Sequence, residues 1–293
     1  MFFLYLLFFL PRECTFYTLK ISVETRSIRP FSKDIFGMSI KHFILLSIAY
    51  LLVTFGTLVH AANLFVPAYF HPSDQPIFWS HLVEAAQTVP TTVIFNPDNG
   101  PGISADPGFT NAIDRVREAG GKVIAYVKSN YGERPMDNIL QDIDSYIAFY
   151  AIDGFFIDEK AADGTDENIM YYETIYNYIK NKSSHYSVTG NPGVVPDEVY
   201  LSKPVVDDLV VFENTIRSYV NFRPENWQHT YPKDRFIHIV YDANLDQMKQ
   251  AFNEADKNHT GHLYITNDRL SNPYDSLPQY GREMLEMSIV TPK

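Results

Sequence analysis

Three carboxylates stand at the ends of apolar runs that are typical of buried strands. The run Gly154–Glu159, read as GFFIDE, ends in Asp158 and Glu159, and the run Asp208–Glu213, read as DLVVFE, ends in Glu213. A buried carboxylate without a partner is costly, so acids at these positions need a reason to be there. Two opposed carboxylates are the minimal set for glycoside hydrolysis, one as acid for the leaving oxygen and one as base or nucleophile at the anomeric carbon. We therefore treat Asp158, Glu159 and Glu213 as candidate catalytic residues.

Polar and aromatic side chains at the ends of the other predicted strands supply candidate contacts to a substrate. Amides, hydroxyls and a lysine can hydrogen-bond to sugar hydroxyls, and aromatic rings present large apolar faces with a polar edge. A polar residue also marks the place where a buried strand meets solvent, and that interpretation stays open for Asn96 and Asn267. The candidate substrate-binding residues are Asn96, Tyr126, Lys128, Tyr131, Asn191, Tyr241 and Asn267, with Trp227 as a further stacking candidate.

Other kinds of catalytic chemistry lack their motifs in this sequence. The nine histidines are scattered without His-x-His or His-Glu-x-x-His spacing, and no Gly-x-Ser-x-Gly elbow is present. The loop Asn96–Gly102 is rich in Gly and Pro, but no Gly-Lys-Ser/Thr follows it, so it is weak as a phosphate cradle. His238 alternates onto one face of its strand with Phe236 and Val240, which favours a structural histidine. We expect no metal and no cofactor.

Eight β-rich runs alternate with segments that have helical spacing of apolar residues. The predicted strands are Leu64–Phe70, Thr91–Asn96, Lys122–Lys128, Gly154–Glu159, Ser187–Asn191, Asp208–Glu213, Arg235–Asp242 and His262–Asn267. The predicted helices are Gln75–Gln87, Pro107–Ala119, Pro135–Tyr150, Glu167–Lys180 and Leu245–Lys257. This alternation indicates parallel βαβ units in one α/β domain.

Eight such units fit a closed (β/α)8 barrel of the TIM type. The alternative is an open doubly wound sheet, but no Gly-rich dinucleotide motif follows the first strand. In a barrel the carboxyl ends of the strands form the mouth that carries the chemistry, and alternate strands share an interior layer. Asp158 and Glu213 end strands that are two apart, so we expect them to face each other across the mouth. If Asp158 points inward with Phe156, Glu159 points away unless the chain has already turned.

The first 61 residues are predicted to lie outside the barrel. Residues 1–37 hold an apolar patch and an unpatterned stretch, and we interpret them as a gene-model extension that does not fold. Residues 38–61 combine a short basic segment, the apolar run Phe43–Val59 and small residues, which is typical of a secretory signal peptide cleaved after Ala61. The run of about 17 residues is near the minimum for crossing a bilayer, so an uncleaved anchor is the alternative. Residues 62–293 then form the barrel domain of a secreted, periplasmic or cell-surface protein.

The composition of this domain excludes several classes of function. It has 18 Lys and Arg against 32 Asp and Glu, a net charge of −14, and nucleic-acid binding relies on Lys and Arg contacts to phosphate. The one cysteine of the chain, Cys14, lies before the domain, so no disulfide, thiolate metal site or cysteine nucleophile is expected. We expect a monomer held together by its core, without nucleic acid and without stable membrane insertion after signal cleavage.

Six blocks of sequence occur in order between about Leu64 and Tyr280. They are VIFNPDNGPG (Val93–Gly102), VIAYVKSNYGERP (Val123–Pro135), DIDSYIAFYAIDGFFIDE (Asp142–Glu159), YYETIYNYIK (Tyr171–Lys180), NPGVVP (Asn191–Pro196) and VVFEN (Val210–Asn214). Together they resemble the spherulin-4 family, also called spherulation-specific family 4, whose enzymes are of the glycoside hydrolase family 135 type. The resemblance implies a (β/α)8 barrel, in agreement with the strand count.

The resemblance also implies an activity and a set of essential acids. Fungal members of the family look like secreted endo-acting hydrolases of exopolysaccharide that contains α-1,4-linked N-acetylgalactosamine. Their essential acids, a pair after the fourth strand and one after the sixth, fall here on Asp158, Glu159 and Glu213. Lys128 stands where histidine is common in the family, and Lys160 follows the acid pair. A cation beside the site would favour ionised carboxylates.

The sequence therefore predicts a secreted, endo-acting glycoside hydrolase of a polysaccharide that contains galactosamine or N-acetylgalactosamine. Asp158 would act as nucleophile, Glu213 as general acid and base, and Glu159 would orient a sugar hydroxyl or tune the pKa of its neighbour. One alternative is a carbohydrate-binding or cyst- or spore-coat protein that uses the same barrel without catalysis. A metal-dependent or phosphate-dependent barrel enzyme is a further alternative.

Overall fold

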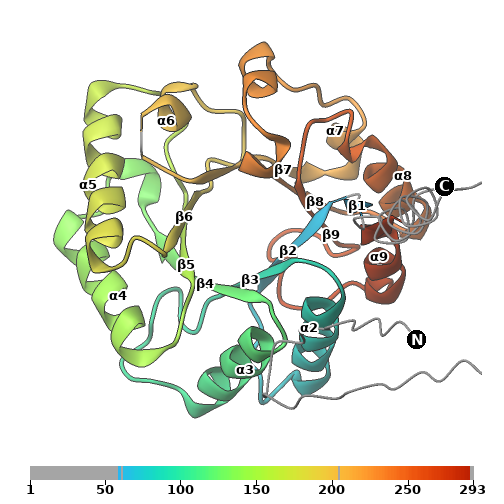
Figure 1. The fold of residues 1–293 in the computed structure, drawn as a ribbon, viewed down its shortest axis with the longest axis horizontal. Coiled ribbons are helices and arrows are strands. Elements are labelled where there is room, and N and C mark those ends of the chain that lie inside the picture. Colours follow the sequence, from blue (N-terminus) through green and yellow to red (C-terminus); the bar gives the residue numbers. More distant parts are fainter. Residues whose placement is uncertain (1–58, 61, 204, 291–293) are drawn as a thin grey trace, which may run out of the picture. The chain divides into compact units, whose positions relative to one another are not determined.

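Eight parallel strands close into a barrel (Figure 1). The computed structural model describes residues 59–60, 62–203 and 205–290, and the barrel lies within them. The strands are β2 (Asn63–Ala68), β3 (Thr91–Phe95), β4 (Lys122–Lys128), β5 (Gly154–Asp158), β6 (Ser187–Gly190), β7 (Asp208–Thr215), β8 (Phe236–Tyr241) and β9 (His262–Ile265). Consecutive strands are hydrogen-bonded neighbours, and β2 pairs with β9 to close the ring. The predicted (β/α)8 barrel is confirmed, and each predicted strand is present with ends that differ by up to two residues.

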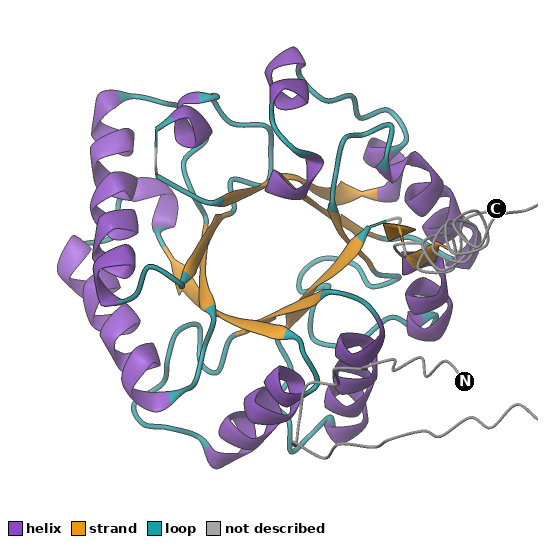
Figure 2. Cartoon of the chain, in the orientation of Figure 1, coloured by secondary structure: helices purple, strands orange, loops and turns teal. Residues whose placement is uncertain are grey.

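Helices lie outside the ring of strands (Figure 2). They are α2 (Pro76–Thr88), α3 (Pro107–Glu118), α4 (Met136–Phe149), α5 (Asp166–Lys182), α6 (Val199–Ser202), α7 (Ile216–Tyr219), α8 (Leu245–Ala255) and α9 (Gly281–Ser288), with 3-10 segments η1 (Asn130–Gly132), η2 (Asn226–Thr230) and η3 (Lys233–Arg235). The five predicted helices are confirmed, whereas α6, α7 and α9 were not predicted. Two of these three helices have only four residues, which is too short to display a helical period.

Local sequence signals explain where the longer helices begin. Asp106 caps α3, because its side chain accepts hydrogen bonds from the backbone N–H groups of Gly108 and Phe109. Pro107 at the first helical position needs no hydrogen-bond partner there. Asn244 and Gln247 form a capping box at the start of α8. Both helices then turn one apolar face toward the barrel.

Large aromatic side chains fill the interior of the barrel. The ring of Phe65 on β2 lies 6.0 Å from that of Phe156 on β5, and Phe156 lies 6.5 Å from Tyr126 on β4. Strands β2 and β5 are not neighbours in the ring, so Phe65 and Phe156 meet inside it. Side chains alternate along a strand, and Asp158 therefore follows Phe156 on the inner side, as predicted.

His238 and Trp227 lie on the outer side of the strands. His238 is fully buried, its Nδ1 lies 3.0 Å from the Tyr219 hydroxyl, and burial lowers the pKa of His238 to about 3. It is therefore a neutral, structural histidine. The ring of Trp227 packs 5.8 Å from that of Phe236, the first residue of β8. Trp227 thus lies at the amino-terminal end of the barrel, and the suggestion that it stacks on a sugar at the mouth was wrong.

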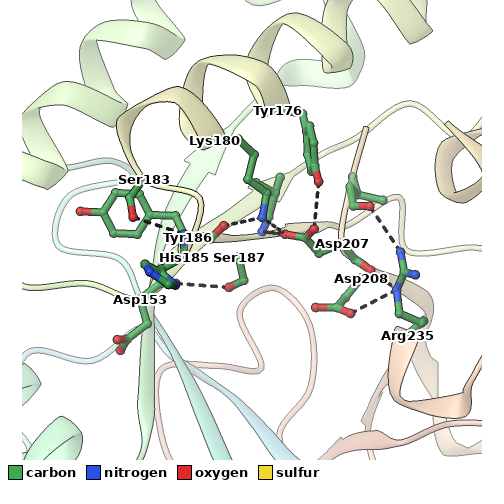
Figure 3. Close-up of polar contacts among 12 residues, drawn as sticks. Asp153, Tyr176, Lys180, Ser183, His185, Tyr186, Ser187, Asp207, Asp208 and Arg235 are labelled. Carbon is green, nitrogen blue, oxygen red and sulfur yellow. Dashed lines mark hydrogen bonds and ion pairs between the residues drawn. The ribbon is translucent and has the colours of Figure 1, made fainter. Parts of the chain in front are cut away.

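An aspartate ties strands and a helix together at that amino-terminal end (Figure 3). Asp207 precedes β7, and its carboxylate accepts from the Val188 N–H of β6 at 2.8 Å and from Lys180 Nζ of α5 at 2.6 Å. The Tyr176 hydroxyl of the same helix donates to its other oxygen at 3.1 Å. Asp207 therefore holds the start of β6 and the end of α5 against the start of β7.

Asp153 repeats this arrangement two strands earlier. It precedes β5, accepts from the Val123 N–H of β4 at 2.8 Å and pairs with Arg117 of α3 at 3.0 Å. Charge-assisted hydrogen bonds of this kind are stronger than bonds between neutral groups. The end of the barrel opposite the mouth is thus built for stability.

Two short strands outside the barrel form a separate two-stranded ribbon. Strand β1 (Val59–His60) pairs antiparallel with β10 (Ile289–Val290). The predicted extension over residues 1–37 and nearly all of the predicted signal peptide over residues 38–61 lie outside the described residues. Cleavage after Ala61 would remove β1 and leave every strand of the barrel. Within residues 59–60, 62–203 and 205–290, no helix has both the length and the apolar character to cross a bilayer.

Candidate active site

One amide group connects two of the three candidate catalytic acids. The Nδ2 atom of Asn191, just after β6, donates to Asp158 Oδ1 at 2.8 Å and to Glu213 Oε2 at 2.7 Å. Asp158 ends β5 and Glu213 lies in β7, so three consecutive strands bring these side chains together at the mouth. The expected meeting of Asp158 and Glu213 is observed, with Asn191 between them.

These two bonds limit the separation of the acids. Because one nitrogen donates to both, Asp158 Oδ1 and Glu213 Oε2 lie at most about 5.5 Å apart, the sum of the two bond lengths. Carboxylates about 5–5.5 Å apart are typical of retaining glycosidases, and inverting enzymes have gaps of about 6.5–9.5 Å.

The backbone fixes the position of Asn191. Its N–H donates to the Ile157 carbonyl at 2.8 Å, and its carbonyl accepts from the Lys160 N–H at 2.9 Å. Its side-chain oxygen accepts from the Gly193 N–H at 2.9 Å, which leaves the amide nitrogen directed toward the acids. Asn191 is buried, so this amide is held in place by the fold.

Three tyrosines surround the two acids. The Tyr274 hydroxyl donates to Glu213 Oε1 at 2.5 Å, and Tyr126 of β4 pairs in register with Phe156 of β5, two residues before Asp158. The ring of Tyr69 lies 5.6 Å from that of Tyr126 and 5.7 Å from that of Tyr274. Burial, followed by the charge of Glu213, raises the pKa of Tyr274, so its phenol stays protonated and acts as a donor. Both oxygens of Glu213 thus accept a hydrogen bond.

Burial, charges and hydrogen bonds together set the pKa values of Asp158 and Glu213. Burial raises the pKa of both carboxyl groups. The charge of Asp158 raises the pKa of Glu213 further, and the charge of Glu159 raises that of Asp158. Hydrogen bonds oppose both rises, from Tyr126 and Asn191 at Asp158 and from Tyr274 and Asn191 at Glu213. Neighbouring carboxylates cannot easily both ionise, so the pair favours a state in which one of the two acids holds a proton.

Glu159 makes a different contact from its neighbour. Its backbone has φ of +48°, a left-handed conformation that is uncommon for a residue with a side chain, so the chain turns immediately after Asp158. Its carboxylate oxygen Oε1 lies 2.9 Å from Lys128 Nζ in an ion pair that is partly open to solvent. Glu159 is therefore placed beside Lys128 and does not join the Asn191 bridge.

Lys160 lies behind the site and does not face the acids. Its side chain is fully buried, with Nζ 2.9 Å from the Ala161 carbonyl oxygen and close to the rings of Tyr200 and Tyr172. Burial lowers the pKa of Lys160 to about 6, which leaves the amine largely neutral near pH 7. The idea that Lys160 acts as a cation beside the carboxylates was wrong, since its ammonium group points into an aromatic enclosure.

The other predicted contact residues occupy different parts of the mouth. Asn96 accepts from the Gly100 N–H at 3.0 Å and so shapes the loop after β3. Tyr131 is 60% exposed with φ of +54°, next to Glu159, whose carbonyl accepts from its N–H. Asn267 uses its oxygen to accept from the Gln279 N–H at 3.1 Å. The structure leaves their roles toward a substrate as predictions.

Tyr241 and the unpredicted Tyr69 and Tyr274 lie nearer to the acids. Burial, then the charges of Glu213 and Asp242, raise the pKa of Tyr241. Tyr69 directly follows β2. It could have been predicted, because side chains at the carboxyl ends of the barrel strands are the ones expected at the mouth. Tyr274 lies in the loop between β9 and α9, where no periodic pattern marks it.

In the part of the chain that the structure describes, no three His, Cys, Asp or Glu side chains come together as a potential metal-binding group.

Comparison with known proteins finds a family model and a curated protein that match this chain. A model of the spherulation-specific family 4 matches residues 63–288. The curated protein spherulin-4 of Physarum polycephalum is 32% identical over 201 residues, which are 65% of this chain and 58% of that protein. The chain thus spans less than two thirds of the length of this relative.

A solved structure has the same fold. The crystal structure of Aspergillus clavatus Sph3 in complex with GalNAc superposes with a TM-score of 0.70 at 22% identity, covering 80% of this chain and 99% of that chain.

Proposed function

Since the chain belongs to spherulation-specific family 4, we propose that it is a secreted glycoside hydrolase that cuts within a polysaccharide containing galactosamine or N-acetylgalactosamine. The observation that carries the proposal is the pair Asp158 and Glu213, bridged by Asn191 inside the barrel mouth. The acids are placed where a TIM barrel has its active site. Their burial and the two-acid geometry match what glycosidic bond cleavage requires.

The separation of the acids supports a retaining mechanism. Ionised Asp158 attacks the anomeric carbon as Glu213 donates its proton to the leaving oxygen, and a covalent glycosyl-Asp158 forms. Glu213, now ionised, takes a proton from water, and the resulting hydroxyl attacks the anomeric carbon and releases Asp158. Asn191 holds both acids at the spacing that this exchange of roles needs.

The surrounding residues fit supporting roles in the same reaction. Glu159, turned away from the bridge and paired with Lys128, would accept a hydrogen bond from a sugar hydroxyl. The exposed ring of Tyr131 is free to stack on a sugar face. Asn96, Tyr126, Tyr241 and Asn267 remain our candidates for further sugar contacts.

Two observations support an aminosugar polymer as the substrate. The related Sph3 structure was solved with GalNAc, and this chain shares its fold. The barrel domain also carries a net charge of −14, which would attract a partly deacetylated, cationic polymer at low salt.

The decisive experiment is reducing-end release from N-acetylgalactosamine polymers by the purified protein. Asp158→Asn and Glu213→Gln should each lower kcat by about 10²- to 10⁴-fold. Asp114→Asn removes an exposed carboxylate on α3 and serves as the matched control. Full activity in either active-site variant would remove the catalytic assignment.

The first product also reports the stereochemistry. Proton NMR of the initial product should give the anomer of the substrate, and the opposite anomer would exclude the retaining mechanism. If wild-type protein binds the polymer without any turnover, the non-catalytic carbohydrate-binding or coat-protein role is favoured instead.

A further inference from the structure

A buried serine lies behind the turn that carries Asp158 and Glu159. Ser129 directly follows β4, the strand beside β5, and its side chain is fully buried. Its Oγ atom lies 2.9 Å from the carbonyl oxygen of Asp158 and 2.9 Å from that of Glu159. Its backbone N–H also donates to the Asp158 carbonyl at 2.9 Å. Ser129 therefore contacts the backbone of both acids.

The convergence of two consecutive carbonyl groups on one hydroxyl requires the turn at Glu159. In an extended strand successive carbonyl groups point to opposite sides, so a single hydroxyl does not reach both. The left-handed φ of +48° at Glu159 brings its carbonyl group to the same side as that of Asp158. This conformation costs free energy for a residue with a side chain, and it persists only when surrounding contacts hold it.

A tyrosine of α5 completes the contacts of the serine hydroxyl. The Tyr172 hydroxyl lies 3.1 Å from Ser129 Oγ and accepts from the Ala161 N–H at 2.8 Å. Carbonyl oxygens only accept hydrogen bonds, so the Ser129 hydroxyl donates to them and the Tyr172 hydroxyl donates to Ser129. Burial raises the pKa of Tyr172, which keeps its phenol protonated for this bond. A chain of hydrogen bonds thus runs from Ala161 through Tyr172 and Ser129 to the carbonyl groups of the acids.

The other contacts of the turn come from backbone groups. The Tyr131 N–H donates to the Glu159 carbonyl at 2.6 Å, and the Lys160 N–H donates to the Asn191 carbonyl at 2.9 Å. Substitution of the Ser129 side chain leaves both of these bonds available. The contribution of the Ser129 hydroxyl to the turn can therefore be tested separately from theirs.

We propose that Ser129, supported by Tyr172, is a positioning residue that holds Asp158 and Glu159 in the geometry needed for cleavage. The inference rests on the hydrolase function proposed above, in which Asp158 attacks the anomeric carbon. The Ser129 hydroxyl contacts carbonyl oxygens and a phenol, so it acts on the position of the acids. A displacement of about 1 Å in a reacting group costs about 10²-fold in rate, so the loss of this hydroxyl should be visible in kcat.

Ser129→Ala removes the hydroxyl and keeps the backbone N–H. We expect kcat for polymer cleavage to fall by about 10- to 100-fold, a larger factor than the change in KM, because Asp158 acts on the reacting atoms. Ser288→Ala is the matched control, since Ser288 is equally buried and its hydroxyl donates to the Met284 carbonyl within α9. The control should keep the wild-type kcat, and circular dichroism checks that both variants are folded.

Tyr172→Phe keeps the aromatic ring and removes the donor to Ser129. It should also lower kcat, and the loss in Ser129→Ala/Tyr172→Phe should be smaller than the product of the two single losses, because the phenol acts through the serine. A wild-type kcat in Ser129→Ala, or fully multiplicative losses in the double variant, would overturn the inference.

Crystal structures of wild type and Ser129→Ala separate this inference from the hydrolase function. In the variant we expect the carbonyl groups of Asp158 and Glu159 to move apart and the ion pair of Glu159 with Lys128, 2.9 Å in the wild type, to lengthen. An unchanged turn would exclude the positioning role at any level of activity. If wild type releases no reducing ends, the hydrolase function fails, and the two structures still decide whether Ser129 holds the turn.

Discussion

Two hydrogen bonds position the carboxylate of Glu213 and lower its pKa. Tyr274 donates to one oxygen at 2.5 Å and Asn191 to the other at 2.7 Å. Both bonds stabilise the ionised form and oppose the rise in pKa that burial and Asp158 produce. A general acid must be protonated to start the reaction, so these two donors set the upper pH limit of activity.

Tyr274→Phe should shift that limit. Loss of the donor raises the pKa of Glu213, and activity that requires protonated Glu213 then persists to higher pH. A hydrogen bond to a charged group is worth about 1.5–3 kcal/mol, so the basic limb of the kcat/KM profile should move up by about one to two pH units. The measurement is a pH profile of polymer cleavage by wild type and variant.

Tyr264→Phe is the matched control for this experiment. Tyr264 is buried with its ring 6.4 Å from that of Tyr274, and within the described residues its hydroxyl makes no hydrogen bond to Asp158 or Glu213. The variant therefore removes the same hydroxyl group without changing a donor to either acid. Its basic limb should stay in place. A downward shift in Tyr274→Phe, or equal shifts in both variants, would refute a direct effect of Tyr274 on Glu213.

At the scale of elements, the contacts of Asp153 and Asp207 at the amino-terminal end of the barrel join strands to helices, and we call each of them an aspartate clamp. Asp207→Asn should lower the free energy of unfolding by about 2–3 kcal/mol, because the carboxylate accepts hydrogen bonds from a lysine, a tyrosine and a backbone N–H at the same time. Urea unfolding followed by circular dichroism measures this difference. Activity of the folded variant should be unchanged, since the mouth lies at the other end of the barrel.

Asp144→Asn supplies the comparison within the same region. Asp144 pairs with Lys182 of α5 at 2.7 Å, but its side chain is 49% exposed. Exposed ion pairs contribute about 0–1 kcal/mol, so this variant should be nearly as stable as wild type. Equal losses in Asp207→Asn and Asp144→Asn would mean that the clamp gains nothing from its backbone contact.

The elements were predictable because their signals are local. Period-two and helical spacing predicted all eight strands and the five long helices, and the positions of Asp158 and Glu213 at the ends of alternate strands predicted that they meet. Asn191 was predicted as a sugar contact, and its place between the acids was not predicted. The turn at Glu159 and the burial of Lys160 were not predictable, since each depends on packing between separate strands. Tyr274 approaches Glu213 across 61 residues of chain, and no pattern around it signals that contact.

The two ends of the barrel differ in what their residues do: the mouth carries the candidate site, and the opposite end stabilises the fold. The half-buried acids and the left-handed residues Glu159 and Asp242 lie at the mouth, where they cost stability. The contacts of Asp153 and Asp207, which hold strands and helices together, lie at the other end. A substitution can therefore be assigned to stability or to substrate by the end of the barrel in which it lies.

Lys160 makes the stability of the whole domain depend on pH. Its pKa falls from 10.5 to about 6 on burial, so between these values the unfolded chain holds one more proton than the folded protein. The free energy of unfolding then rises with pH, by at most about 1.4 kcal/mol per pH unit from this one group. Below about pH 6 the contribution is constant, because both states are protonated there.

Lys160→Met should remove that dependence. Methionine keeps the length of the side-chain stem, which packs on Gly190 beneath Asn191, and carries no charge to neutralise. The variant should be more stable than wild type near pH 6.5, and the gap should narrow toward about pH 8.5 at a rate of about 1.4 kcal/mol per unit. Lys249→Met, at an exposed position, should give a constant difference from wild type in the same urea titrations. A gap between Lys160→Met and wild type that does not change with pH would mean that Lys160 keeps its proton in the folded protein, held over the rings of Tyr172 and Tyr200.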